Sequence, residues 1–172
     1  MVTMTKILNK SLPPLLGLFL ALLLMPMASS QAANYKAPNF SLKTLDKKTI
    51  KLSSYKGKVV YLDFWASWCE PCRKSFPWMR KLQSKYKKQG LRVITINLDK
   101  DKAELKRFLR DFRINFPVGL DPNGKVAQRY RVKAMPSSYL IDRKGRVRYV
   151  HLGFLQKDEK KTEERIKKLL KK

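Results

Sequence analysis

The only two thiols of the chain, Cys69 and Cys72, stand three positions apart in the stretch DFWASWCEPCRKSFPW (63–78). A structural disulfide usually closes a longer loop, because cross-linking a long loop removes more entropy from the unfolded chain. A closed zinc site would need two further ligands. The spacing therefore indicates a redox pair, in which one thiolate attacks a partner disulfide and the other thiol resolves the mixed disulfide.

The flanking residues place this pair between a strand and a helix. The near-continuous apolar run 58–66 predicts a central strand buried on both faces. Pro71 then opens a helix that ends near Gly90. Its apolar residues at helical spacing are Phe76, Met79, Leu82 and Tyr86. At the helix start, free backbone N–H groups and the helix dipole stabilise the Cys69 thiolate, whereas Cys72 lies one turn deeper.

Asp63 interrupts the apolar strand six residues before Cys69. Carboxylates are rarely buried without a partner, so an acid at this position needs a reason. Burial should raise its pKa towards neutrality, which suits a general base. We therefore expect Asp63 to be catalytic, with a strand-end ion pair to a lysine as the alternative.

The rest of the chain alternates strands and helices. The predicted elements are a strand pair within 39–52, a buried strand at 91–98, a helix capped by Asp101, a short helix near 125–130, a hairpin formed by SSYLID and VRYVHLG, and a last helix at about 157–171. Glu104 stands where a capping box would place it. This order predicts an α/β fold with helices on both faces of the sheet.

The first 33 residues have the layout of an export signal. A basic start precedes the apolar stretch 12–28, and the small residues that follow fit cleavage after Ala32 or Ala33. An uncleaved anchor is the alternative, although a membrane span typically needs about 20 residues. We expect residues 1–33 to be the signal peptide and residues 34–172 to form one domain that works outside the cytosol, in the periplasm of a cell that has one.

Charge is the other extreme feature, with 39 Lys and Arg against 13 Asp and Glu. Residues 1–33 hold only two of the basic residues and no acidic one, so residues 34–172 carry a net charge near +24 (37 minus 13). Such a surface keeps a protein soluble and attracts it to an anionic membrane surface or acidic partners. No basic motif interleaved with aromatic residues is present, so we expect no nucleic-acid binding.

The segments VVYLDFWASWCEPCRKSFP (59–77) and MPSSYLID (135–142) together resemble the thioredoxin superfamily, specifically the exported TlpA/ResA-like thiol–disulfide oxidoreductases. The resemblance implies a thioredoxin fold, with a central mixed β-sheet, helices on both faces and an extra N-terminal β-hairpin. It implies that Cys69 is the nucleophile and Cys72 the resolving thiol of a reversible disulfide. Asp63 matches the buried aspartate of thioredoxins, which the resemblance implies takes the proton from the resolving cysteine.

The resemblance also implies the substrate contacts. Pro136 matches the family's cis-proline, which faces the disulfide and helps hold the substrate chain, and Met135 then offers backbone hydrogen bonds to an extended substrate. Trp68 precedes the nucleophile and is expected on the docking surface, with shielding of the disulfide from water as the alternative. Relatives carry an acidic residue where this chain has Ser75, so a general disulfide reductase fits as well as one dedicated to apocytochrome c.

Glu70 and Pro71, between the cysteines, are expected to tune the pair. The negative charge of Glu70 disfavours the Cys69 thiolate and hence the reduced protein, and Arg73 and Lys74 partly offset it. We predict a reductant of exported proteins with a potential nearer that of thioredoxin (about −270 mV) than that of DsbA (about −120 mV). Such a monomeric reductant would need a membrane thiol as its electron donor.

Other activities stay open on the sequence alone. A disulfide oxidase or isomerase would share this fold, and a Cu(I) carrier would use the two cysteines as soft ligands. A thiol peroxidase would carry proline and threonine where this chain has Leu62 and Ala66. The sole histidine, His151, lies in a predicted strand far along the chain. We therefore expect an ordinary strand residue there, and neither a metal site nor a cofactor.

Overall fold

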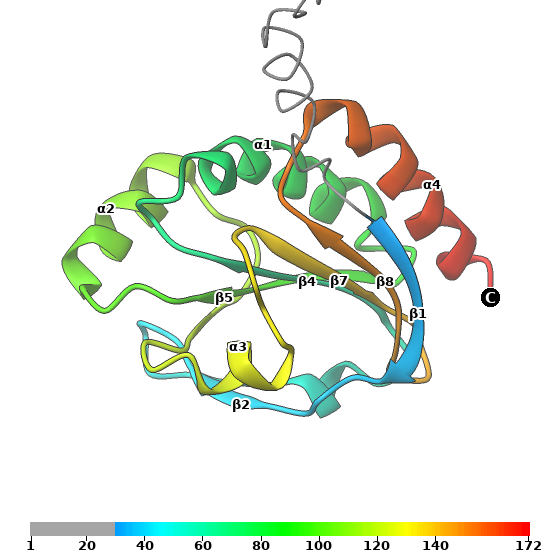
Figure 1. Cartoon of the computed structure of the whole chain (residues 1–172), viewed down its shortest axis with the longest axis horizontal. Helices are drawn as coiled ribbons and strands as arrows, with labels where there is room; N and C mark the ends of the chain where they lie inside the picture. Colours follow the sequence, from blue (N-terminus) through cyan, green and yellow to red (C-terminus); the bar gives the residue numbers. More distant parts are fainter. Residues whose placement is uncertain (1–29) are drawn as a thin grey trace, which may run out of the picture.

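A mixed six-stranded sheet forms the centre of the structure, a computed structural model that describes residues 30–172 (Figure 1). The strand order is β1-β8-β7-β4-β5-β6, with β5 parallel to β4 and β6 and the other neighbours antiparallel. The strands are β1 (Ser30–Lys36), β4 (Val59–Trp65), β5 (Leu91–Asn97), β6 (Val118–Leu120), β7 (Ser137–Ile141) and β8 (Arg146–Leu152). Most of the predicted signal peptide lies outside the described residues.

Helices cover both faces of this sheet, as predicted. Figure 1 shows α1 (Glu70–Tyr86), α2 (Lys102–Phe112) and α4 (Glu159–Leu170) on one face. The other face carries α3 (Lys125–Arg129) and the small antiparallel sheet of β2 (Ser41–Lys43) and β3 (Thr49–Lys51). Each face has its own hydrophobic cluster of buried residues. The predicted fold, including the extra N-terminal hairpin, is confirmed.

The central strand β4 is buried along its whole length. It lies between β5 and β7, so both of its edges are paired, and both of its faces are covered by helices or by the small sheet. Trp65 and Phe64 are fully buried on opposite faces. The near-continuous apolar run of the sequence therefore corresponds to a strand that is shielded from solvent on both faces.

Helix α1 begins directly after this strand with Cys69 as its N-cap. The four apolar residues predicted for its inner face, Phe76, Met79, Leu82 and Tyr86, are all buried. The helix ends at Tyr86 and is followed by turns up to Gly90, one turn earlier than predicted. Pro77 lies inside the helix on its exposed side, where the ring meets solvent.

The start of α2 is partly as predicted. Asp101 caps the helix by accepting a hydrogen bond from the backbone N–H of Ala103 at 2.7 Å. The predicted capping box is wrong, because the Glu104 carboxylate lies 2.9 Å from the Arg107 guanidinium, one turn along the same helix. An exposed ion pair at this spacing competes with the return contact to the N-cap.

Two strands were not predicted. β1 begins at Ser30, within the predicted signal, and pairs with β8, so that cleavage after Ala33 would remove the start of this strand. The three-residue β6 follows Pro117 in a stretch that the sequence indicates as a loop. Both strands lie at sheet edges and owe their conformation to pairing with a neighbour. Within residues 30–172, no helix is long and apolar enough to cross a membrane.

Replacement of Phe76 by alanine should be among the most destabilising changes in the core. Its fully buried ring contacts Trp65 and Phe108 with centroids 4.5 and 4.8 Å away. Such truncations cost about 3–5 kcal/mol of unfolding free energy, which urea denaturation would measure. Phe112→Ala, in the same cluster but half-buried, is the matched control and should cost less than half as much. Equal losses would contradict this packing.

Candidate active site

Cys69 and Cys72 form a disulfide at the N-terminus of α1. Their Cα atoms lie 5.2 Å apart, and the backbone N–H of Cys72 donates a hydrogen bond to the Cys69 sulfur at 3.3 Å. Cys69 is 6% exposed and Cys72 is fully buried. A thiolate at Cys69 would meet the open N–H groups of the first helical turn, so the accessible sulfur is also the one that the helix stabilises as an anion.

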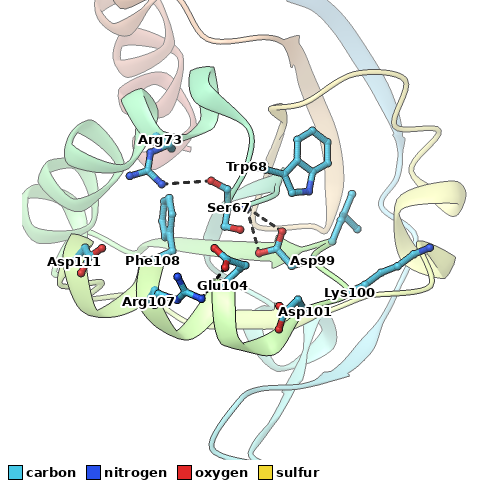
Figure 2. A pocket seen from close by; sticks show the side chains of 11 residues that line it. Ser67, Trp68, Arg73, Asp99, Lys100, Asp101, Glu104, Arg107, Phe108 and Asp111 are labelled. Carbon is cyan, nitrogen blue, oxygen red and sulfur yellow. Dashed lines mark hydrogen bonds and ion pairs between the residues drawn. The ribbon is translucent and has the colours of Figure 1, made fainter.

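The loop that carries Cys69 is held by the end of the neighbouring strand β5. The backbone N–H of Ser67 donates to both carboxylate oxygens of Asp99, at 3.0 and 3.2 Å (Figure 2). Asn97 donates its side-chain amide to the same carboxylate at 2.9 Å. Asp99 is buried. Sequence reasoning missed this residue, although its place after a buried parallel strand was the available signal.

A cavity of about 620 Å³ lies beside this loop, between it and α2. Trp68 lines it and is 72% exposed, the most exposed large hydrophobic side chain of the described residues. Arg73 lies over the ring of Phe108 at 5.2 Å and donates to the backbone carbonyl of Ser67 at 3.4 Å (Figure 2). The cavity therefore has an aromatic rim next to the disulfide and a charged floor on α2.

The acidic residue between the cysteines has a partner of its own. The carboxylate of Glu70 lies 3.6 Å from the Lys74 ammonium, one turn along α1, and both side chains are mostly exposed. Of the two basic residues expected to offset Glu70, only Lys74 meets it, since Arg73 is engaged by the aromatic rings of α2. Pro71 is exposed in the first turn.

Asp63 lies inside the sheet on the face covered by α1. It is 1% exposed, and its Oδ1 accepts a hydrogen bond from the Ser138 hydroxyl at 2.7 Å. That hydroxyl in turn accepts from the hydroxyl of Tyr61 at 2.7 Å. Burial raises the pKa of the Asp63 carboxyl to about 7, and the hydrogen bond from Ser138 lowers it by a smaller amount. The partner of Asp63 is thus a hydroxyl rather than a lysine.

The two residues expected to hold substrate lie before β7. The Met135–Pro136 peptide bond is cis. Met135 is half-buried and packs against the hydrophobic cluster that contains both cysteines. Pro136 is buried, and its carbonyl oxygen accepts from the backbone N–H of Gly153 at 2.8 Å. This bond ties the segment to the end of β8.

Two further residues complete the surroundings. Ser75 is buried, and its hydroxyl donates to the carbonyl oxygen of Cys72 at 2.8 Å. Position 75 therefore holds a neutral hydroxyl and no carboxylate. His151 lies in β8, as predicted, but register places it opposite Ser138, which contacts Asp63. Sequence reasoning missed Tyr61 and Ser138, which stand far apart along the chain. Among residues 30–172, no three His, Cys, Asp or Glu side chains are grouped as a metal site would require.

Similarity to known proteins agrees with this geometry. Residues 33–150 match the AhpC/TSA family. The thiol-disulfide oxidoreductase ResA of Bacillus thuringiensis is 38% identical over 134 residues, which cover 78% of this chain and 76% of that protein. ResA of Bacillus subtilis is 40% identical over 117 residues, or 68% of this chain and 65% of that protein.

Solved structures show the same relationship. A thiol:disulfide interchange protein DsbE from Chlorobium tepidum is 46% identical, with a TM-score of 0.78 over 80% of this chain and 97% of that one. A protein disulfide isomerase from Bacteroides thetaiotaomicron is 28% identical, with a TM-score of 0.74 over 83% and 95% of the two chains. The chain belongs to the AhpC/TSA family and, within the thioredoxin superfamily, to the ResA-like thiol–disulfide oxidoreductases.

Proposed function

We propose that this chain reduces disulfides of exported proteins, with Cys69 as the nucleophile and Cys72 as the resolving thiol. The observation that carries the proposal is the disulfide at the start of α1, in which Cys69 retains some exposure and Cys72 has none. An incoming protein can reach only the first sulfur. The second is placed to act after the mixed disulfide has formed.

The reaction then balances as two thiol–disulfide exchanges. The Cys69 thiolate attacks one sulfur of the substrate disulfide and expels the other as a thiolate, which takes up a proton. Cys72 loses its proton and attacks Cys69, which releases the second substrate thiol and leaves the Cys69–Cys72 disulfide. Two electrons pass to the substrate, so a membrane thiol donor must return two electrons before the next turnover.

Asp63 is the group we assign to the proton of Cys72. It is buried on the sheet face beneath α1, between Tyr61 and Trp65 along β4, and both of these rings pack in the cluster that contains the two cysteines. A carboxyl whose pKa lies near 7 exchanges a proton readily at neutral pH. Since Ser75 replaces the acidic residue of its relatives, Asp63 takes the acid–base role alone.

Substrate binding is assigned to the surface around the disulfide. Trp68 offers an exposed aromatic ring beside Cys69, and Met135 and the cis-proline Pro136 offer an extended backbone to the substrate chain. Glu70 and Pro71 tune the pair from within the motif. The substrate class is therefore polypeptides that present an extended segment around a disulfide.

The place of action follows from the sequence rather than from the described residues. We assign residues 1–33 to an export signal and residues 34–172 to one periplasmic or otherwise extracytoplasmic domain that acts as a monomer. The net charge near +24 would hold this domain close to an anionic membrane surface, where a membrane thiol donor resides.

Trapping experiments test the assignment of the two thiols. Cys72→Ala, reduced and mixed with insulin, should accumulate a covalent adduct on Cys69 that dithiothreitol releases, and mass spectrometry would detect it. Cys69→Ala is the matched control and should form little adduct, because Cys72 is buried. An adduct that forms only on Cys72 would reverse the roles, and rapid peroxide consumption by the wild type would point to a peroxidase instead.

Asp63→Asn should stabilise the oxidised protein above neutral pH. Burial raises the pKa of this carboxyl from near 3.8 to about 7, so the folded protein holds the proton more tightly than the unfolded chain does. The free energy of unfolding therefore falls as pH rises from about 4 to 7, by about 1.4 kcal/mol per unit. Allowing for one unpaired amide N–H in the variant, we expect a gain of about 2 kcal/mol at pH 8 by urea denaturation.

The same variant should gain nothing at pH 4, where the wild-type carboxyl is protonated in the folded state. Asp111→Asn, at an exposed carboxylate on α2, is the control and should show little change at either pH. Equal gains for Asp63→Asn at pH 4 and pH 8 would mean that Asp63 does not titrate between them.

The reduction potential tests the direction of electron flow. We expect a value near that of thioredoxin, about −270 mV, from equilibration in dithiothreitol buffers. Glu70→Gln should raise it by about 10–20 mV, since loss of the negative charge favours the Cys69 thiolate, and Lys74→Gln should lower it by a similar amount. A potential near that of DsbA would favour a disulfide oxidase or isomerase.

A further inference from the structure

Asp63 belongs to a row of polar side chains that crosses four neighbouring strands. The strand registers pair Thr95 of β5 with Asp63 of β4, Asp63 with Ser138 of β7, and Ser138 with His151 of β8. Directly paired residues project to the same face of a sheet. All four are at most 9% exposed, so the row lies between the sheet and the helices that cover it.

Two hydrogen bonds in series lead from Tyr61, outside the row, through Ser138 to Asp63. Tyr61, two residues before Asp63 and on the same face, donates its hydroxyl proton to Ser138 Oγ. The Ser138 hydroxyl has a single proton, which it donates to Asp63 Oδ1. The ring of Tyr61 is held by an edge-to-face contact with Trp78 of α1, with centroids 5.6 Å apart. The hydroxyl of Ser138 is therefore fixed towards Asp63.

The second oxygen of the carboxylate is used differently. Asp63 Oδ2 is buried and has no hydrogen-bond partner among the described residues. Burying an ionised carboxylate oxygen without a hydrogen-bond donor costs free energy, so this oxygen favours a group that can supply a proton to it. Cys72 of α1, whose side chain is fully buried in the cluster that covers this face, is the thiol that must lose a proton in the reaction.

We propose that Ser138, held by Tyr61, is a positioning residue for Asp63: it fixes Oδ1, favours the ionised carboxylate and leaves Oδ2 for the proton of Cys72. This inference rests on the proposed function, because it assigns a helper to the proposed base. Neither Ser138 nor Tyr61 needs to touch substrate. Each acts through the carboxylate.

The other titratable groups near Asp63 stay uncharged at neutral pH. Burial raises the pKa of Tyr61 well above its usual value, and the nearby Asp63 carboxylate raises it further. Burial lowers the pKa of His151, despite the Asp158 carboxylate 3.8 Å from its Nε2. Cys72 is in the disulfide in the oxidised protein. In that state, the Ser138 hydroxyl is thus the polar contact that favours ionisation of Asp63, against the larger opposing effect of burial.

The row itself supplies a matched control. Thr95 faces Asp63 from the opposite strand, but its buried hydroxyl has no hydrogen-bond partner in the described part of the chain. Thr95→Val removes that hydroxyl with little change in shape, whereas Ser138→Ala removes the hydroxyl that binds Asp63. The two variants differ chiefly in whether the lost hydroxyl contacts the carboxylate.

The test is the titration of Asp63 in the oxidised full-length protein, followed by carboxyl carbon-13 NMR, with Asp63→Asn to assign the signal. Ser138→Ala should move the midpoint upward by about one pH unit, a tenfold change in the ionisation constant. Ser138→Thr keeps a hydroxyl and should stay close to the wild type, and so should Thr95→Val. Tyr61→Phe keeps the ring and should move the midpoint upward by less than Ser138→Ala.

An unchanged midpoint in both Ser138→Ala and Tyr61→Phe, or an equal shift in Thr95→Val, would overturn the proposal. Using two variants covers the case in which one of them fails to fold. A parallel measurement separates this proposal from the proposed function, namely the pH dependence of mixed-disulfide resolution in a single turnover. One outcome is that the NMR midpoint shifts in Ser138→Ala, while the wild-type rate of mixed-disulfide resolution does not change across the pH range in which Asp63 ionises. In that case the positioning by Ser138 stands and the base role of Asp63 fails.

Discussion

The junction between β4 and α1 is the constraint on which the site depends. The end of β4 is bound to the end of β5, where the backbone N–H of Leu98 donates to the carbonyl of Trp65 at 2.9 Å. Two residues after Trp65, the backbone N–H of Ser67 donates to the carboxylate of Asp99, the residue after Leu98. The parallel pairing of the two strands therefore determines where the loop ends and where α1 begins. Cys69 becomes a helix N-cap because its loop is anchored on both sides.

A second constraint is that a carboxylate interrupts β4, a strand that is buried along its whole length. A sheet covered on both faces favours apolar side chains, yet Asp63 shares one face of β4 with Tyr61 and Trp65. The sheet compensates in part, since the strand register places hydroxyl groups beside the acid on either side. One hydroxyl binds it and the other does not. Local stability is given up where the proposed chemistry needs a titratable group.

Much of this arrangement is predictable from the sequence, and the exceptions share one cause. The run 58–66 and the apolar stripe of α1 are local patterns, so β4, α1 and the place of the cysteines follow from them. Ser138 and Tyr61 are 77 positions apart, and only the strand register brings them together. The edge strands β1 and β6 have no strong pattern of their own, because their conformation comes from pairing. The prediction of a capping box was wrong because the Glu104 carboxylate pairs with the Arg107 guanidinium instead of the helix N-cap.

These features act together on the redox pair, because both sulfurs and Asp63 belong to one water-poor region. The first turn of α1 favours the Cys69 thiolate and hence the reduced protein. Lys74 partly offsets the charge of Glu70, and both side chains are exposed to screening by salt. The buried Asp63 carboxylate is not screened in this way, and once ionised it disfavours a second negative charge on either sulfur. As pH rises past about 7, ionisation of Asp63 therefore counteracts the stabilisation of the Cys69 thiolate by the first turn of α1. The equilibrium of the pair shifts towards the disulfide, which is the direction a reductant requires.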